Sequence, residues 1–277
     1  MIKQFEQSYA ELVLDVLRNG EKRKTRNQYT RSLFGKQLIV DCKIGELALL
    51  RGRKMYYKGV FGELAAMLRK PKTVDDFRMW GCNYWDKWAD KDGNLVVDYG
   101  NAWHADGQIE RLKHSLEHNP ADRRMIINGW RPGMLNTLSL PCCHYAYQFY
   151  VRGLDTGEYY LDMMWHQRSV DLMVGLPSDI VFAQAWLIAI ANQFGFVPGR
   201  ITMTLGDTHI YEGHVENAGV YLNQWQDIYE AGPFDYVEPP TYNVLVPFGT
   251  DFCDFKPSWL DVANYNPAPR VEFELYE

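Results

Sequence analysis

The chain has 277 residues, of which 47% are hydrophobic and 23% charged, as in an ordinary globular protein. Its net charge of -6 argues against a dedicated nucleic-acid-binding protein, because such proteins carry a basic excess. The five cysteines form no CxxC pair, so we expect neither a disulfide framework nor a bound metal. The N-terminus has no apolar signal core and no apolar stretch is long enough to span a bilayer, which predicts a cytoplasmic protein without a membrane partner.

The first part of the chain predicts two amphipathic helices and little strand. Apolar residues at helical spacing over 5–17 predict a helix that ends at Gly20. The stretch 21–31 is basic and polar, so we expect a loop there. Three further elements are expected: a strand over 33–42, a short buried helix over 60–68, and a helix over 106–118 with Ile109, Leu112 and Leu116 inward.

The second part predicts most of the sheet. Three strand-like runs are expected, over 124–130, 144–151 and 159–166. The remaining elements are expected to be a long apolar helix over 179–194, a break at Pro198-Gly199, a strand over 201–205, a helix over 208–225, and mostly loop from Ala231 onward, with short strands near 242–246 and at the tail. This mixed order, with no repeat and no linker, favours a single α+β domain over residues 1–277.

Cys143 is the first candidate for catalysis, because His144 follows it at an expected strand start. Alone the pair is weak evidence, since a buried cysteine most often acts as a small hydrophobe. Arg123, Arg124 and Arg168 add guanidinium forks that suit phosphate oxygens, although a surface salt bridge is the commoner role for each.

His209 and Tyr211 offer an imidazole and a phenol two residues apart, which can hydrogen-bond a sugar hydroxyl. The alternative is a helix N-terminus capped by Asp207 or Thr208. Both interpretations can hold together.

Sequence blocks along nearly the whole chain resemble the thymidylate synthase family. They stand in the family's order and spacing: 62–64, 85–90, Tyr99-Gly100, Arg123-Arg124, 141–144, 147–151, 167–169 with Asp171, 175–177, 206–211 and 265–269. The resemblance implies one thymidylate-synthase-like α+β domain whose mixed β-sheet forms the interface of a homodimer. It also implies a pyrimidine nucleotide and 5,10-methylenetetrahydrofolate as substrates.

The resemblance assigns the catalytic roles residue by residue. Cys143 matches the thiolate that adds to C6 of the base, so that C5 attacks the folate-borne methylene. A thiol needs a lowered pKa or a nearby cation for this, and the surrounding arginines are expected to supply that field. Glu63 matches the residue that manages proton transfers, and Tyr99 the one implicated in removal of the C5 proton. His144 is expected to hydrogen-bond within the same network.

The resemblance also assigns binding roles. Arg123 and Arg124 match arginines that reach the partner's phosphate across the dimer. In the phosphate loop the family's Arg-Thr-Gly-Thr-Gly is replaced by 25–29, where Arg26 is our candidate. The other expected ligands are Arg168 and Ser169 for the phosphate of the same subunit, Gln167 and Asp171 for the nucleotide, His209 and Tyr211 for the 3′-hydroxyl, and Trp85, Trp88 and Asp171 for the folate.

Asp179 departs from the family pattern, because the synthases carry an Asn there. That amide accepts from uracil N3–H and donates to O4, and a carboxylate cannot donate to O4. Cytosine presents an N4 donor and an N3 acceptor, which a carboxyl sharing one proton can pair. The alternative is a helix-capping Asp without base contact. Asp179 also resembles the aspartate of phage dCMP hydroxymethylases, which would serve DNA modification.

The product depends on whether hydride or water reaches the exocyclic methylene at C5. The 130–132 segment resembles the Arg-Pro of the hydroxymethylases. The tail is acidic where the synthases end in small apolar residues that seal the site against water. Both features favour 5-hydroxymethyl-dCMP. Trp85 and Trp88 are synthase-like and favour the methyl product. The alternatives are therefore a dCMP methyltransferase, a thymidylate synthase acting on dUMP, and a catalytically idle nucleotide- or RNA-binding relative.

Overall fold

A computed structural model describes residues 2–26, 28–42, 44–230 and 238–276. Its centre is a six-stranded sheet in the order β1-β2-β6-β5-β4-β3, in which β5 and β6 run parallel and all other neighbours are antiparallel. Strands β7 and β8 form a separate antiparallel pair. The α+β class and the mixed sheet expected from the sequence are confirmed.

The strands are β1 (Glu21–Lys24), β2 (Tyr29–Asp41), β3 (Ile126–Asn128), β4 (His144–Arg152), β5 (Tyr160–Asp171), β6 (Val197–Tyr211), β7 (Thr241–Val244) and β8 (Leu260–Ala263). The α-helices are α1 (Ile2–Asn19), α2 (Tyr57–Met67), α3 (Val74–Arg78), α4 (Tyr99–Trp103), α5 (Gln108–His118), α6 (Gly175–Phe194) and α7 (Val215–Glu230). The predicted helices at 5–17, 60–68 and 106–118 are confirmed, and Ile109, Leu112 and Leu116 are buried.

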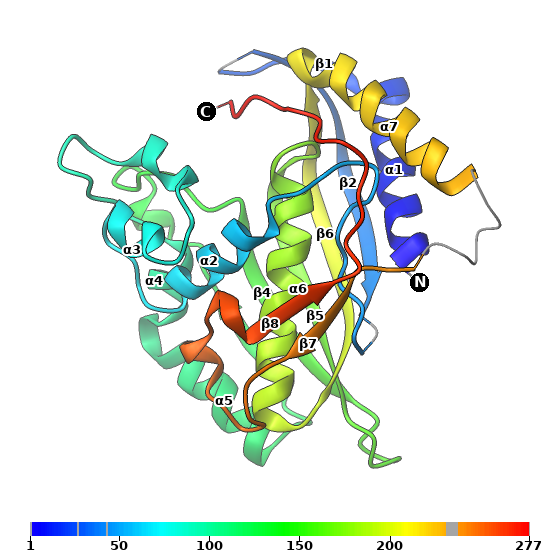
Figure 1. Cartoon of the computed structure of the whole chain (residues 1–277). Helices are drawn as coiled ribbons and strands as arrows, with labels where there is room; N and C mark the ends of the chain where they lie inside the picture. Colours follow the sequence, from blue (N-terminus) through cyan, green and yellow to red (C-terminus); the bar gives the residue numbers. More distant parts are fainter. Residues whose placement is uncertain (1, 27, 43, 231–237, 277) are drawn as a thin grey trace.

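Helices α1 and α6 cover one face of the large sheet (Figure 1). Helix α6 is apolar around its whole circumference, because it lies between this face and α2. Trp186 of α6 stacks on Trp103 of α4, with ring centroids 4.5 Å apart, and meets Tyr147 of β4 edge-on. These aromatic rings pack against β4 close to the point where the strand begins.

The other face of the sheet carries no helix in the described part of the chain and exposes apolar side chains. Ile126, Gln148, Met164, Thr202 and Ile39 are cross-strand neighbours in one row from β3 to β2, so their side chains share this face. Ile126, Met164 and Ile39 are 46%, 39% and 42% exposed. A row of this kind is unusual on a solvated surface.

Three secondary-structure predictions are wrong. The expected loop at 21–31 is the hairpin β1–β2, whose first strand is solvent-exposed and therefore lacks the alternation that predicts strands. Pro198 and Gly199 lie inside β6 and do not break it. Residues 208–211 belong to β6 as well, so the helix expected there begins only at Val215, and the helix-cap alternative for Asp207 or Thr208 is wrong.

Smaller differences concern the ends of elements. Helix α6 begins at Gly175 and not at Asp179. Strand β7 confirms the prediction near 242–246, whereas residues 264–276 contain no strand. The part of the expected loop at 231–237 lies outside the described residues, as do Asn27 of the phosphate loop and Glu277 of the tail. No helix in the described part of the chain has the length and apolar character that crossing a bilayer requires.

Candidate active site

Cys143 lies immediately before β4, where the pairing with β5 shifts register between His144 and Ala146. Such bulges re-aim side chains and occur next to active sites. Its backbone is held from both sides, because the Cys143 N–H donates to the Tyr99 hydroxyl at 2.7 Å and its carbonyl accepts from the Arg168 N–H at 2.9 Å. The thiol is therefore fixed between α4 and β5.

The expected cationic field around Cys143 is only partly present in one chain. Burial raises the pKa of the Cys143 thiol, while Arg168 opposes this and Asp179 adds to it. The Arg168 fork is already bound to the loop before β4, with Nε on the Cys142 carbonyl at 2.9 Å and Nη2 on the Pro141 carbonyl at 3.0 Å. Cys142 itself is buried, which fits the structural role expected for it.

Glu63 of α2 has both carboxylate oxygens bound by residues of one short 3₁₀ helix, Tyr84–Trp88. The Tyr84 hydroxyl donates to Oε2 at 2.6 Å and the Trp85 indole N–H donates to Oε1 at 2.7 Å. Burial raises the pKa of Glu63, and these two donors partly offset it. Tyr84 was missed in the sequence; its only signal was its position beside Trp85.

The two tryptophans expected at the folate differ in exposure. Trp85 is buried, stacks on Phe77 with ring centroids 5.1 Å apart, and turns its N–H to Glu63. Trp88 is half-buried, with its ring 5.4 Å from that of Trp85. Trp85 thus positions Glu63, and Trp88 is the more accessible surface for a planar ligand.

His144 is buried and neutral. Its Nδ1 lies 2.6 Å from the Tyr147 hydroxyl, which also lies 3.1 Å from the His144 carbonyl. Burial lowers the pKa of His144 to about 3, so the ring stays uncharged at neutral pH. Its Nε2 faces Asp179 Oδ1 at 3.8 Å.

Asp179 lies in the second turn of α6 and caps nothing, so the helix-cap alternative for this residue is wrong. Its Oδ2 accepts a 2.7 Å hydrogen bond from the Gln167 amide, and its Oδ1 points toward His144. Burial raises the pKa of Asp179 to about 8, Gln167 opposes the rise, and the carboxyls of Glu63 and Asp171 add to it. Asp179 is therefore a neutral acid at pH 7 and shares its surroundings with Cys143 and Glu63.

Asp171, His209 and Tyr211 adjoin this cluster at the ends of β5 and β6. Asp171 pairs with His209 in the parallel ladder, and its Oδ1 accepts from the N–H groups of Met173 and Val174 ahead of α6. Burial lowers the pKa of His209, but the Asp207 carboxyl outweighs this and the net shift is upward. The rings of His209 and Tyr211 lie 5.1 Å apart. Ser169 is half-buried on β5 beside Asp207 of β6.

The basic hairpin β1–β2 runs along the same end of the sheet. Thr30 of β2 is the cross-strand neighbour of both Arg23 and Tyr211, and Arg23 forms a 3.7 Å ion pair with Asp207. Arg26, the residue expected in the phosphate loop, is exposed in the turn of this hairpin. Arg23 was not among the residues predicted for the site.

Arg123 and Arg124 are not brought to Cys143 within one chain. Both are exposed just before β3, and Arg124 donates to Asp122 at 3.0 Å. The β3–β4 register places them roughly 20 Å along the sheet from Cys143, at 3.3 Å per residue. This explains why a single chain lacks the expected cationic field.

Arg131 has a partner that the sequence did not indicate. Its guanidinium binds the fully buried carboxylate of Asp98, the residue before Tyr99. Burial raises the pKa of Asp98, and Arg131 opposes the rise. Arg131 therefore stabilises the start of α4. Because its guanidinium is bound to Asp98, Arg131 does not support a prediction that water reaches the site.

The C-terminal tail crosses between the two halves of this site. Lys87, beside the tryptophans, donates to the Leu275 carbonyl at 2.8 Å. His214 bonds the Glu274 carbonyl at 2.8 Å, and Tyr276 packs on Tyr211 with ring centroids 4.8 Å apart. The tail thus links the expected folate block to the expected sugar ligands.

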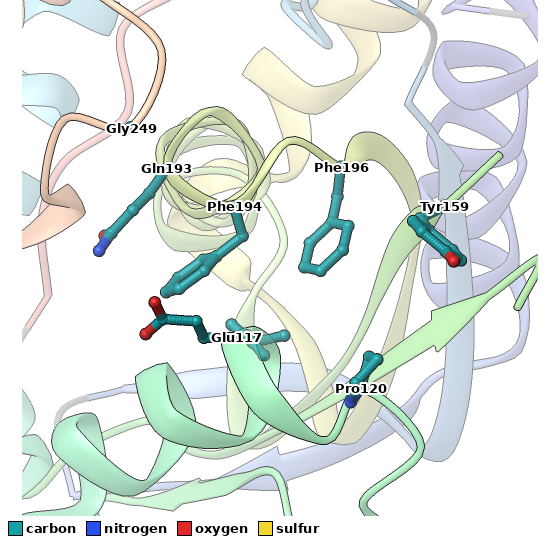
Figure 2. A pocket seen from close by; sticks show the side chains of 8 residues that line it. Glu117, Pro120, Tyr159, Gln193, Phe194, Phe196 and Gly249 are labelled. Carbon is teal, nitrogen blue, oxygen red and sulfur yellow. The ribbon is translucent and has the colours of Figure 1, made fainter. Parts of the chain in front are cut away.

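A cavity of about 550 Å³ lies at the opposite end of α6 (Figure 2). It is lined by Leu116, Glu117, Pro120, Tyr159, Gln193, Phe194, Phe196 and Gly249, none of which was predicted as a site residue. Asp179 and Phe194 are fifteen residues apart on one helix, roughly 20 Å at 1.5 Å per residue. This cavity is therefore separate from the Cys143 cluster.

Within the described residues, no group of three or more His, Cys, Asp or Glu side chains is arranged to hold a metal ion.

The family model described as thymidylate synthase matches residues 7–276, nearly the whole chain and every residue of the cluster described above. The chain belongs to the thymidylate synthase family.

Proposed function

We propose that the chain transfers a one-carbon unit from 5,10-methylenetetrahydrofolate to C5 of dCMP and releases 5-hydroxymethyl-dCMP. The family relationship supports folate-dependent one-carbon transfer to C5 of a pyrimidine nucleotide. The choice of cytosine rests on Asp179, a carboxyl that lies among Cys143, His144 and Glu63 and has no role as a helix cap.

A neutral Asp179 provides one O–H donor and one carbonyl acceptor. Cytosine offers N3 as an acceptor and N4–H as a donor, so the two edges pair without leaving a buried polar group unmatched. An unmatched buried group costs about 1–3 kcal/mol, which is enough to select a base. A neutral carboxyl can also serve uracil if its two oxygens exchange roles. Selection therefore depends on which oxygen holds the proton.

The chemistry needs a thiolate and proton transfers at C5. In the proposal the Cys143 thiolate adds to C6, and the resulting carbanion at C5 bonds to the methylene carbon of the folate. Tyr99, whose hydroxyl accepts from the Cys143 N–H, lies beside this residue and is the group to which we assign removal of the C5 proton. Glu63 serves the remaining proton transfers through water, as a buried carboxylate with fixed oxygens suits.

Removal of the C5 proton expels tetrahydrofolate and leaves an exocyclic methylene at C5. Water adding to this methylene, as the Cys143 thiolate leaves C6, gives the hydroxymethyl group, whereas hydride from tetrahydrofolate gives methyl and dihydrofolate. The tail supports the first outcome, because it contributes Glu272 and Glu274 where an apolar seal would exclude water. A dCMP methyltransferase is the second candidate, favoured by Trp85 and Trp88. A catalytically idle relative would have no use for the retained Cys143. A dUMP-specific synthase would have no use for the buried carboxyl of Asp179.

A homodimer is part of the proposal. The open face of the sheet, with the row from Ile126 to Ile39, supports a two-fold contact in which the same surface meets itself. In such a dimer the exposed Arg123 and Arg124 of one chain serve the phosphate site of the other. They would add the cations that a single chain lacks near Cys143.

One assay tests the proposal. The protein is incubated with methylenetetrahydrofolate and either dCMP or dUMP, the products are identified by mass spectrometry, and dihydrofolate is followed by absorbance. We expect 5-hydroxymethyl-dCMP without dihydrofolate. Turnover of dUMP alone would contradict the role of Asp179, and methyl-dCMP with dihydrofolate would contradict the product. Cys143→Ala should abolish turnover; residual activity would contradict the nucleophile.

A further inference from the structure

We infer that Tyr276 in the C-terminal tail is a positioning residue, which seats against Gly213 and thereby holds the end of the tail and the ring of Tyr211 in place. The role of Tyr211 as a sugar ligand rests on the proposed function, whereas the seat at Gly213 follows from contacts within one chain. Tyr276 was not among the residues predicted for the site.

Gly213 provides the space that the Tyr276 hydroxyl occupies. It is the middle residue of the 3₁₀ turn Glu212–His214, which joins β6 to α7. Its φ lies outside the left-handed region, so the backbone does not require glycine at this position. A Cβ atom here would collide with the Tyr276 hydroxyl. The missing side chain therefore serves Tyr276 and not the turn.

The ring of Tyr276 completes a group of aromatic rings at the end of β6. It lies 4.8 Å from the ring of Tyr211 and 5.0 Å from that of His214, centroid to centroid. The rings of Tyr211 and His214 also meet, at 5.6 Å and nearly at right angles. Tyr211 contacts His209 of its own strand as well, so Tyr276 contributes the neighbour that comes from the tail.

The other contacts of the tail are of a different kind. Three of its carbonyls, at residues 272, 274 and 275, accept from Asn217, His214 and Lys87 at 2.7, 2.8 and 2.8 Å. Any tail sequence presents carbonyls, so these bonds do not select a side chain. Phe273 packs on His214, with ring centroids 5.2 Å apart. Tyr276 adds the contact with Tyr211, and so ties the tail to the strand that carries the expected sugar ligands.

The first test measures hydrogen exchange of the backbone amides of residues 270–276 by mass spectrometry, without substrate. Tyr276→Ala removes the ring, and Gly213→Ala displaces it without altering the tail. Each should accelerate exchange about tenfold, as expected when two aromatic contacts are lost. The matched control is Gly219→Ala in α7, where a Cβ atom would meet nothing within 4 Å. Unchanged exchange in Tyr276→Ala or in Gly213→Ala overturns the seat.

A suppressor variant separates the specific seat from a general loss of packing. The double variant Gly213→Ala with Tyr276→Phe keeps the ring and removes the hydroxyl that would collide with the new Cβ atom. Exchange should therefore return to near the wild-type rate. Exchange as fast as in Gly213→Ala alone overturns the direct contact between these two residues.

The second test measures KM and kcat for the nucleotide that the protein turns over. Both single variants should raise KM several-fold and change kcat less, because a ligand that binds ground state and transition state equally affects KM. The suppressor variant should restore KM. A loosened tail with unchanged KM overturns the role of Tyr276 at Tyr211. A wild-type protein that acts only on dUMP contradicts the proposed function instead and leaves the exchange result standing, so the two failures are distinguishable.

Discussion

The Tyr84 hydroxyl donates a 2.6 Å hydrogen bond to Oε2 of Glu63, while the neighbouring Trp85 holds Oε1. Burial raises the pKa of Glu63, and Tyr84 is the larger of the two donors that oppose the rise. The carboxyl to which we assign proton transfer is thus held in place by a phenol from the adjacent 3₁₀ helix, which also offsets part of the rise in its pKa.

Tyr84→Phe should raise the pKa of Glu63, because the ionised carboxylate loses a donor. A hydrogen bond to a charged group contributes about 1.5 kcal/mol or more, which corresponds to about one pKa unit. The acid limb of the pH profile of kcat should therefore move upward by about one unit. Tyr56→Phe is the matched control, since this exposed tyrosine donates to the Gly81 carbonyl and does not contact Glu63 within the described residues. An unshifted limb in Tyr84→Phe would show that Tyr84 only packs.

Asp179→Asn should transfer the preference from dCMP to dUMP. An amide bonds uracil N3–H and O4 at once, whereas cytosine meets mismatched groups at two positions. Two unpaired groups predict a fall of roughly 100-fold in kcat/KM for dCMP, together with a gain for dUMP. The exposed Asp75→Asn serves as control. Retention of dCMP preference in Asp179→Asn would mean that Asp179 does not contact the base.

Activity on dCMP should depend on the proton of Asp179, whose pKa burial raises to about 8. Below that pH the carboxyl keeps its proton and can donate to N3 of cytosine. Above it the carboxylate faces the N3 lone pair, so kcat/KM for dCMP should fall about tenfold per pH unit. The measurement is the pH profile of dCMP against that of dUMP in Asp179→Asn. A shared alkaline limb would assign the loss to another group.

Arg131 should contribute strongly to stability, because it compensates the fully buried carboxylate of Asp98. Removing one partner of a buried pair costs about 3 kcal/mol, so Arg131→Met should lower Tm by several degrees in a thermal melt. The double variant Asp98→Leu with Arg131→Met removes the orphaned charge and should recover most of that loss. If the single variant melts like the wild type, Asp98 does not depend on Arg131, because it is protonated or solvated without it.

The sequence predicted the elements whose burial follows a period, such as α1 and α5, and the set of residues that meets around Cys143. It failed where solvent or the neighbouring strand decides the conformation. The exposed β1 has no apolar alternation, and 208–211 extend β6 because they pair with β2 and β5. The polar residues of 21–31 indicated a loop, and the pattern from 208 onward indicated a helix.

The contacts that tune the site were also beyond prediction. The Tyr84 hydroxyl meets Glu63 only because the chain between α2 and the 3₁₀ helix folds back in the packed structure. Trp165 and Gln167 share one face of β5, but the bond from the Trp165 indole N–H to the Gln167 amide oxygen depends on side-chain conformations that the sequence does not indicate. A buried tryptophan is expected in any core, so composition cannot mark the one whose N–H orients an amide. Motif spacing predicts the residues that are expected to contact substrate, but it does not predict the neighbours that hold their side chains in place.

The proposed homodimer predicts complementation between inactive variants. Cys143→Ala and the double variant Arg123→Ala with Arg124→Ala should each be inactive, since one lacks the nucleophile and the other the partner's phosphate ligands. Subunits mixed in equal amounts and reassorted should regain about a quarter of the wild-type sites, because half of the dimers are mixed and each has one intact site. Activity on dCMP measures the recovery.

A second mixture controls for this result. Cys143→Ala and Glu63→Gln affect the same site of one chain, since Glu63 and Cys143 lie in one cluster. Every site in that mixed dimer carries one defect, so no activity should return. Equal recovery in both mixtures would point to contamination by wild-type protein. No recovery with the arginine variant would place Arg123 and Arg124 outside the active site, and the open face of the sheet would then need another explanation than a shared phosphate site.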